Sequence, residues 1–162
     1  MTICVAITNG TRTIMGCDSM ISDGITKSMS TLPKIVKRNN LLIGVAGSLS
    51  TLNKIYFDYE PSVQNCPDKE YFWRVANEIK GLTGDDDYSI LLATGKTLGT
   101  CSQHMDMEFP AGYTAIGSGY AYALGCLFPY SIRKKQHLTA ALNAASLYDA
   151  GCGGSYTYLT IS

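Results

Sequence analysis

The chain has 162 residues, of which 46% are hydrophobic and 16% are charged, and its 13 basic and 13 acidic side chains give a formal net charge of zero. This length suits one domain with a sizeable core, and the neutral charge balance argues against general binding to nucleic acid or to an anionic membrane surface. The sequence contains no apolar run long enough to span a membrane and no leader pattern, so we expect a cytoplasmic protein.

The first third of the chain is predicted to form two β-hairpins, because apolar β-prone runs flank short turns that contain asparagine. The first turn is expected to be a two-residue loop at Asn9-Gly10, and the second lies at Asn39-Asn40. The four strands of these hairpins are predicted at residues 3–8, 11–17, 34–38 and 41–46.

Two helices are expected next, because apolar residues recur at helical spacing over residues 48–59 and 68–82. Further strands are predicted at residues 88–94, 96–102, 112–119 and 155–162. The last two helices are predicted at residues 120–130 and 138–151.

Strand runs and helix pairs alternate as blocks in this order, rather than as β-α-β units. Such an order predicts an α+β fold in which two antiparallel sheets pack face to face and helices cover their outer faces. We therefore expect residues 1–162 to form a single domain, a four-layer αββα sandwich.

The cysteine and histidine content bears on metals and cofactors. The six cysteines show no Cys-x-x-Cys spacing, and the chain has only two histidines. Without export, the cysteines are expected to be reduced thiols. We therefore expect no structural zinc site, no other metal and no cofactor.

The predicted hairpins bring several polar residues towards one end of the fold. Counting outward from the first turn puts Thr2 opposite Cys17 and within one residue of Asp18. The same count in the second hairpin puts Lys34 and Gly47 near one end of that hairpin. If the two hairpins are neighbours, these residues converge.

An active site with an N-terminal nucleophile needs these kinds of group: a terminal threonine, an aspartate, a lysine and a turn that contains glycine. Removal of Met1 would free the α-amine of Thr2, whose pKa of about 7.7–8.0 allows it to take the hydroxyl proton. Lys34, paired with Asp18, would favour deprotonation of that hydroxyl. The N–H of Gly47, where a strand passes into a helix, would hold an oxyanion. Taken singly, each of these residues also has an ordinary structural explanation.

Together with further motifs, these residues give the sequence a resemblance to proteasome β-type subunits and their bacterial relatives HslV and Anbu. Members of this family are N-terminal nucleophile hydrolases. The similar segments, in the family's order, are TICVAI with CDSM, TLPKIVKR, IGVAGSLS, AIGSGYAYALG and YDAGCGGSYTYL.

The resemblance implies catalytic roles for Thr2, Asp18, Lys34, Gly47, Ser118 and Asp149. Thr2 would attack the substrate, and Ser118 and Asp149 would orient the chain terminus. Cys152 stands where the family has a serine, just before the Gly153-Gly154 pair.

By the same resemblance, we expect a threonine peptidase that cleaves peptides or proteins as a homo-oligomeric ring, with an ATPase unfoldase as a further partner. The high hydrophobic content agrees with buried subunit interfaces. Two alternatives stay open: a small-molecule amidase on the same fold, and a non-catalytic ring or scaffold subunit.

Overall fold

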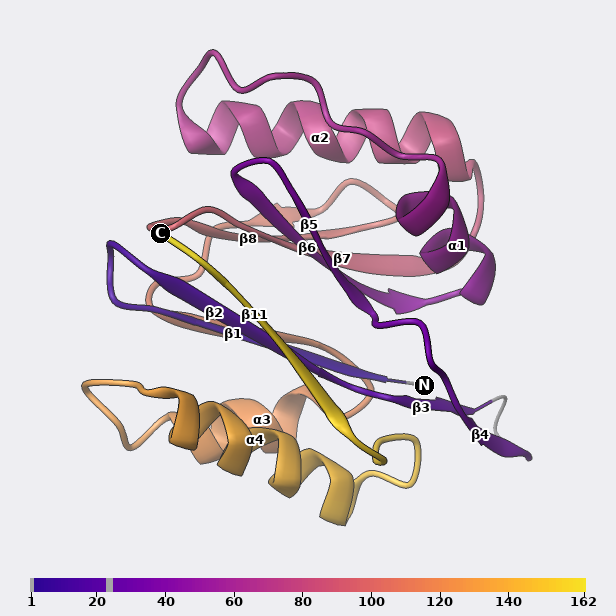
Figure 1. The fold of residues 1–162 in the computed structure, drawn as a ribbon, viewed down its shortest axis with the longest axis vertical. Coiled ribbons are helices and arrows are strands. Elements are labelled where there is room, and N and C mark those ends of the chain that lie inside the picture. The colour runs from indigo at the N-terminus through magenta and orange to yellow at the C-terminus, as the bar shows by residue number, and fades with distance from the viewer. Residues whose placement is uncertain (1, 23–24) are drawn as a thin grey trace.

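The computed structural model describes residues 2–22 and 25–162, which contain two main antiparallel sheets (Figure 1). The first sheet has the strand order β10-β1-β2-β11, with bounds β1 Ile3–Thr8, β2 Thr13–Asp18, β10 Tyr113–Gly117 and β11 Tyr156–Ile161. The second sheet has the order β5-β6-β7-β8-β9, with bounds β5 Ile35–Arg38, β6 Leu41–Gly47, β7 Tyr88–Ala93, β8 Leu98–Ser102 and β9 Met107–Glu108. A short ribbon joins β3 (Met20–Ser22) to β4 (Lys27–Met29).

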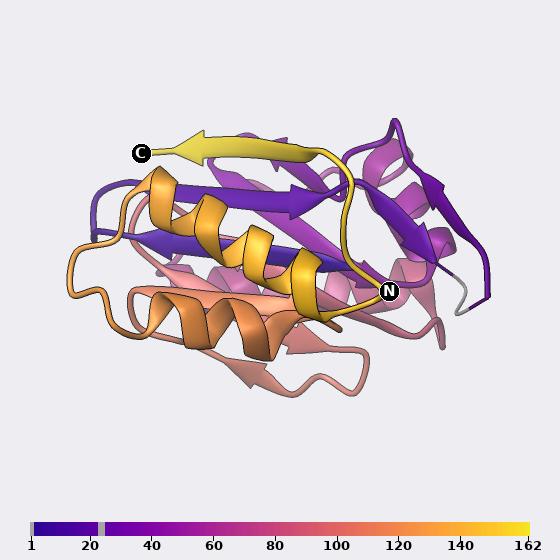
Figure 2. The same ribbon diagram turned by 90° about the horizontal axis from the view of Figure 1, so that it is seen from below.

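Helices lie on the outer face of each main sheet. Helices α1 (Leu49–Phe57) and α2 (Asp68–Thr83) lie beside the five-stranded sheet (Figure 1). Helices α3 (Tyr120–Leu127) and α4 (Lys135–Tyr148) lie side by side across the four-stranded sheet (Figure 2). The predicted mixture of helix pairs with antiparallel sheets is therefore confirmed.

Strand β1 lies in the middle of the fold and is buried on both faces. Its odd-numbered residues Ile3, Val5 and Ile7 pack against α3 and α4. Its even-numbered residues Cys4 and Ala6 pack between the two sheets. This double burial explains why the strand is a continuous apolar run without polar alternation.

The first hairpin differs from the sequence-based expectation. Its turn spans residues 9–12, so Thr8 pairs with Thr13, and Cys4, rather than Thr2, lies opposite Cys17. The side-chain oxygen of Asn9 accepts hydrogen bonds from the N–H groups of Thr11 (3.1 Å) and Arg12 (2.8 Å), which stabilises the longer turn. The prediction of a two-residue loop at Asn9-Gly10 was therefore wrong.

The second hairpin has the predicted register, with Arg38 opposite Leu41. The N–H of Val45 donates to the carbonyl of Lys34 at 2.9 Å, so these two residues are opposite each other as expected. Strands β3, β4 and β9 were not predicted.

Helix α3 ends and α4 begins earlier than predicted. Helix α3 stops at Leu127, and α4 runs from Lys135 to Tyr148 rather than over residues 138–151. Lys134 and His137 explain the early start of α4, because the Lys134 N–H donates to His137 Nδ1 at 3.1 Å and the first turn is capped.

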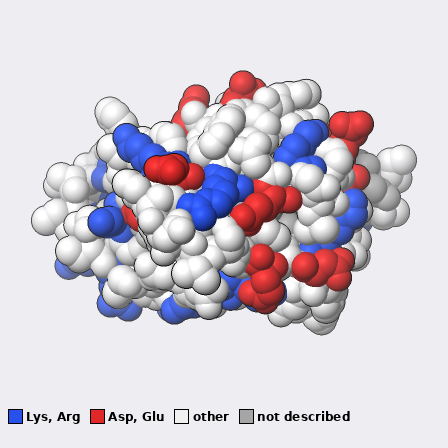
Figure 3. Space-filling model, turned by 90° about the horizontal axis from the view of Figure 1, so that it is seen from above, with Lys and Arg blue, Asp and Glu red and all other residues white. Residues whose placement is uncertain are grey.

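The surface over α2 carries basic and acidic side chains interspersed, without a large area of one sign (Figure 3). Over the described ranges, none of the helices combines the length and the apolar character needed to cross a bilayer.

Candidate active site

The side chain of Thr2 lies just before β1, at the end of the four-stranded sheet. Its hydroxyl donates a hydrogen bond to Asp18 Oδ1 at 3.0 Å, and only 4% of the residue is exposed. The N–H of Ile3 donates to the same oxygen at 3.1 Å. One carboxylate thus binds both the Thr2 side chain and the backbone of the next residue.

Asp18 ends β2 and is buried, with 1% of the residue exposed. Lys34, which is 4% exposed, places its Nζ 2.6 Å from Asp18 Oδ1 and also donates to the carbonyl of Met20. The N–H of Gly153 donates to Asp18 Oδ2 at 2.9 Å. Several charge-assisted hydrogen bonds therefore compensate a carboxylate that has lost its water.

Local sequence explains how these groups meet. The longer first turn puts Ile3 across from Asp18, so Thr2 projects one residue beyond the paired strands. Lys34 immediately precedes β5 and is fixed by its backbone contact to β6. Pairing of β11 with β2, which sets Tyr156 opposite Asp18, brings the preceding glycines to the carboxylate.

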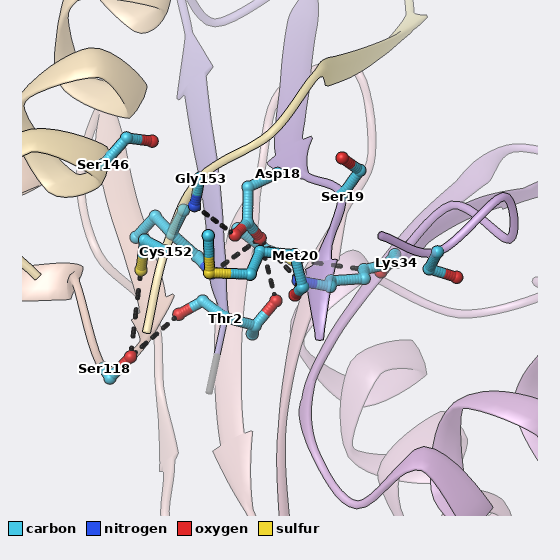
Figure 4. Close-up of polar contacts among 12 residues, drawn as sticks. Thr2, Asp18, Ser19, Met20, Lys34, Ser118, Ser146, Cys152 and Gly153 are labelled. Atoms are coloured by element: carbon cyan, nitrogen blue, oxygen red, sulfur yellow. Dashed lines mark hydrogen bonds and ion pairs between the residues drawn. The ribbon is translucent and has the colours of Figure 1, made fainter. Parts of the chain in front are cut away.

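Ser118 and Cys152 lie on the other side of Thr2 from Lys34 (Figure 4). The Ser118 hydroxyl donates to the Thr2 carbonyl at 3.5 Å and lies 3.8 Å from Cys152 Sγ. Burial raises the pKa of the Cys152 thiol to about 12, so the thiol is neutral at physiological pH.

Gly117 permits the close approach of β10 to Thr2. It has φ +102°, and a Cβ there would lie 2.8 Å from the Thr2 carbonyl carbon. A larger residue would therefore push Ser118 and Thr2 apart.

Gly47 ends β6 with φ +116°, a backbone conformation that favours glycine. Because N–H groups alternate along a strand and Val45 N–H points to Lys34, the N–H of Gly47 points to the same side of β6. Ser48 then caps α1 by accepting a hydrogen bond from the Ser50 N–H at 3.1 Å. The Gly47 N–H therefore faces a cavity beside Thr2.

This cavity has a volume of about 290 Å³. Its lining includes Thr2, Lys34 and Gly47 together with the apolar side chains of Ile21, Val45, Leu49 and Leu52. A hydroxyl, a cation and a backbone donor thus border one space that an apolar group can enter.

Asp149 follows the last residue of α4 and is placed differently from the other predicted residues. Its carboxylate accepts a hydrogen bond from the Gly151 N–H at 2.7 Å, and its carbonyl accepts one from Cys152 N–H at 3.1 Å. Asp149 therefore shapes the turn that leads to Cys152 and Gly153, rather than contacting Thr2 itself.

The structure thus brings Thr2, Asp18, Lys34 and Ser118 together, with Gly47 on the adjoining cavity. Met1, whose removal the expected mechanism needs, lies outside the described residues.

Sequence reasoning missed the carbonyl of Met20 and the apolar lining at Ile21, because the short strand β3 was not predicted. The β-prone run Met20-Ile21 after the Asp-Ser pair was the signal for it. Among the residues that the structure describes, no group of three or more His, Cys, Asp or Glu side chains is arranged to hold a metal ion.

No protein-family model matches the sequence, and no curated protein matches it. Solved structures are similar over almost the whole chain. BPH of Thiobacillus denitrificans in complex with epoxomicin has a TM-score of 0.84 at 17% identity, covering 99% of this chain and 98% of that one. A second structure of this BPH has a TM-score of 0.81 at 18% identity, with coverage of 99% and 98%. Eukaryotic HslV from Trypanosoma brucei has a TM-score of 0.79 at 16% identity, with coverage of 99% of each chain. The chain therefore has the fold that its resemblance to proteasome β-type subunits, HslV and Anbu predicts.

Proposed function

We propose that the protein is a threonine peptidase that cleaves peptide bonds through an acyl ester on Thr2, after removal of Met1. The observation that carries the proposal is the buried contact of the Thr2 hydroxyl with Asp18, the carboxylate that also binds Lys34. The fold shared with HslV, and with a BPH that binds epoxomicin, supports the same function.

In the proposed reaction, the α-amine of Thr2 takes the proton of its own hydroxyl, and Oγ1 attacks the carbonyl carbon of the substrate. The positive charge of Lys34 favours the developing alkoxide. The Gly47 N–H donates to the oxyanion, an interaction worth about 2.7–4 kcal/mol for one donor in a hydrolase. The protonated amine then gives its proton to the leaving nitrogen, and water hydrolyses the ester.

The remaining residues would position the terminus. Ser118 binds the carbonyl of Thr2 and so orients the residue that bears the amine. Asp149 would act through the turn that carries Cys152 and Gly153, since Gly153 in turn binds Asp18.

We further propose that residues 1–162 form one domain whose two sheets and two helix pairs make the αββα sandwich of the N-terminal nucleophile hydrolases. Copies of the domain would assemble into a cytoplasmic ring that takes peptide or protein substrates, with an ATPase unfoldase as a partner. Exposed apolar side chains on the described surface, among them Phe57, Phe128 and Leu147, support burial between subunits.

The first experiment is the reaction of the purified protein with epoxomicin, followed by intact mass and peptide mapping. The expected result is a Met-free chain that gains the mass of one inhibitor on its N-terminal peptide. Thr2→Ala should gain none and should cleave no peptide, while Thr2→Ser, which keeps a hydroxyl, should still react.

Thr2→Ala should stay folded, because the hydroxyl makes one hydrogen bond, worth about 1 kcal/mol net. Persistent peptide cleavage by a clean Thr2→Ala preparation would exclude the mechanism. Hydrolysis of simple amides without peptide cleavage would favour the small-molecule amidase, and a retained Met1 with no reaction would favour the scaffold subunit.

A further inference from the structure

Two cavities flank Thr2 on opposite sides. The first, described above, is lined by apolar side chains and is called the acyl cavity here. The second has a volume of about 280 Å³ and is called the exit cavity. Both cavities include Thr2 and Gly47 in their lining. The remaining residues of the exit cavity do not line the acyl cavity; they are Ala46, Asp87, Tyr88, Ser89, Gly117 and Ser118.

Strand geometry indicates which cavity receives the leaving group. In β1 the N–H groups of even-numbered residues point towards β10, as the bond from Thr8 N–H to the Gly112 carbonyl shows (2.8 Å). Ile3 N–H, one residue after Thr2, points the other way and binds Asp18. The nitrogen of Thr2 therefore lies on the β10 side, where Ser118 borders the exit cavity.

This nitrogen carries the proton that the departing amine must receive. The leaving half of a substrate therefore departs on the side of the exit cavity, and the acyl half occupies the apolar cavity where the Gly47 N–H lies. The side chain that follows the scissile bond thus meets the lining of the exit cavity.

The exit cavity is distinguished by one acidic side chain. Asp87 is exposed and is the one acidic residue among those that line the cavity. Its neighbours have cationic partners, since Asp86 lies 3.1 Å from Lys54 Nζ and Asp85 lies 3.5 Å from Lys80 Nζ. Within the described ranges 2–22 and 25–162, no Lys, Arg or His side chain pairs with Asp87, so its charge is available to a ligand.

We propose that the exit cavity is the subsite for the residue after the scissile bond, and that Asp87 selects a lysine or arginine there. This inference rests on the proposed peptidase function. A cation in the cavity would pair with an exposed carboxylate, and exposed pairs of this kind change an equilibrium by about two- to fivefold. The same carboxylate would attract the new α-ammonium group of the departing product.

The test uses the Met-free protein and three peptides that differ only in the residue after the scissile bond: lysine, alanine or glutamate. For the wild type, kcat/KM is expected to be about two- to fivefold higher for lysine than for alanine, and lower for glutamate than for alanine. In 0.5 M NaCl the three values should converge, because salt screens exposed charges.

Asp87→Asn should remove the preference for lysine, and Asp87→Lys should reverse it in favour of glutamate. Asp85→Asn is the matched control, because it removes the same charge from the same loop at a side chain outside the cavity, and it should keep the preference.

Equal cleavage of the three peptides by the wild type, or an unchanged order in Asp87→Asn, would overturn the role of Asp87 while leaving the peptidase function intact. Cleavage of none of them by a Met-free protein would overturn the peptidase function and this inference together. If Asp87→Asn slows the reaction with epoxomicin as much as the cleavage of the lysine peptide, Asp87 acts on Thr2 and the subsite assignment is wrong.

Discussion

Replacing Lys34 by methionine is expected to destabilise the fold and to abolish turnover. Methionine keeps a linear side chain but leaves the Asp18 charge buried without a cation, since Asp18 is only 1% exposed. Removal of one partner from a buried pair costs about 3–5 kcal/mol. Hydrogen bonds from Thr2, Ile3 and Gly153 to Asp18 stay in place, so we expect the lower end, about 3 kcal/mol.

For a chain of this length, each kcal/mol lowers Tm by about 2–4 °C, so Tm of Lys34→Met should fall by about 6–12 °C. Urea unfolding followed by circular dichroism gives the free energy of unfolding for the wild type, Lys34→Met, Asp18→Asn and the double variant. The double variant should be more stable than Lys34→Met alone, because the uncompensated charge is gone. It should nevertheless be inactive, since the cation beside Thr2 is also gone.

A loss below about 1 kcal/mol in Lys34→Met would refute the reasoning, because it would mean that solvent or another group compensates Asp18. A double variant less stable than Lys34→Met would refute it as well. Lys34→Arg keeps the charge but has a larger, forked head in place of a compact ammonium, so it should not restore turnover. Wild-type rates in Lys34→Arg would mean that any positive charge at this position is sufficient, whatever the shape of its head group.

Three further predictions concern the oxyanion donor, the buried thiol and assembly. Gly47→Ala keeps the backbone N–H but should displace it, because its Cβ would lie 2.8 Å from Tyr88 Cα. Turnover should fall by up to about 10²- to 10³-fold, the cost of losing one oxyanion donor, and the protein should be destabilised by about 1–3 kcal/mol. Gly84→Ala, with φ +65° but no atom within 4 Å of its Cβ, is the control that adds backbone strain without a clash and should keep its activity. Burial raises the pKa of Cys152 to about 12, so about one thiol in ten thousand is ionised at pH 8, and iodoacetamide should modify Cys152 slowly in the folded protein, with a rate that rises with pH. Rapid labelling of Cys152 at pH 8, mapped by mass spectrometry, would contradict its burial as a neutral thiol. Activity should fall on dilution from micromolar to nanomolar protein as light scattering shows the assembly dissociating, whereas a fully active monomer would argue against a ring.

The sequence by itself determined those features that depend on residues close together in the chain. The second hairpin has the predicted register, because a tight turn at Asn39-Asn40 dictates which residues pair on its two sides. Apolar periodicity likewise located α1 and α2, with ends that differ from the prediction by at most two residues. The candidate residues Thr2, Asp18 and Lys34 could be named in the same way, since each lies at a strand end of a predicted hairpin.

Only the tertiary structure decided features that depend on contacts between distant segments. The first turn is a local feature that the sequence analysis missed, because the side chain of Asn9 binds Thr11 and Arg12, two and three residues away, and so lengthens the turn. The bond from the Gly153 N–H to Asp18 joins residues 135 positions apart, and no local pattern encodes it. The two cavities beside Thr2, and the place of Asp87 in one of them, arise where the ends of both sheets meet. Hairpin pairing is encoded locally because the turn sets the register, whereas such contacts form only when packing of the apolar faces brings the two sheets together.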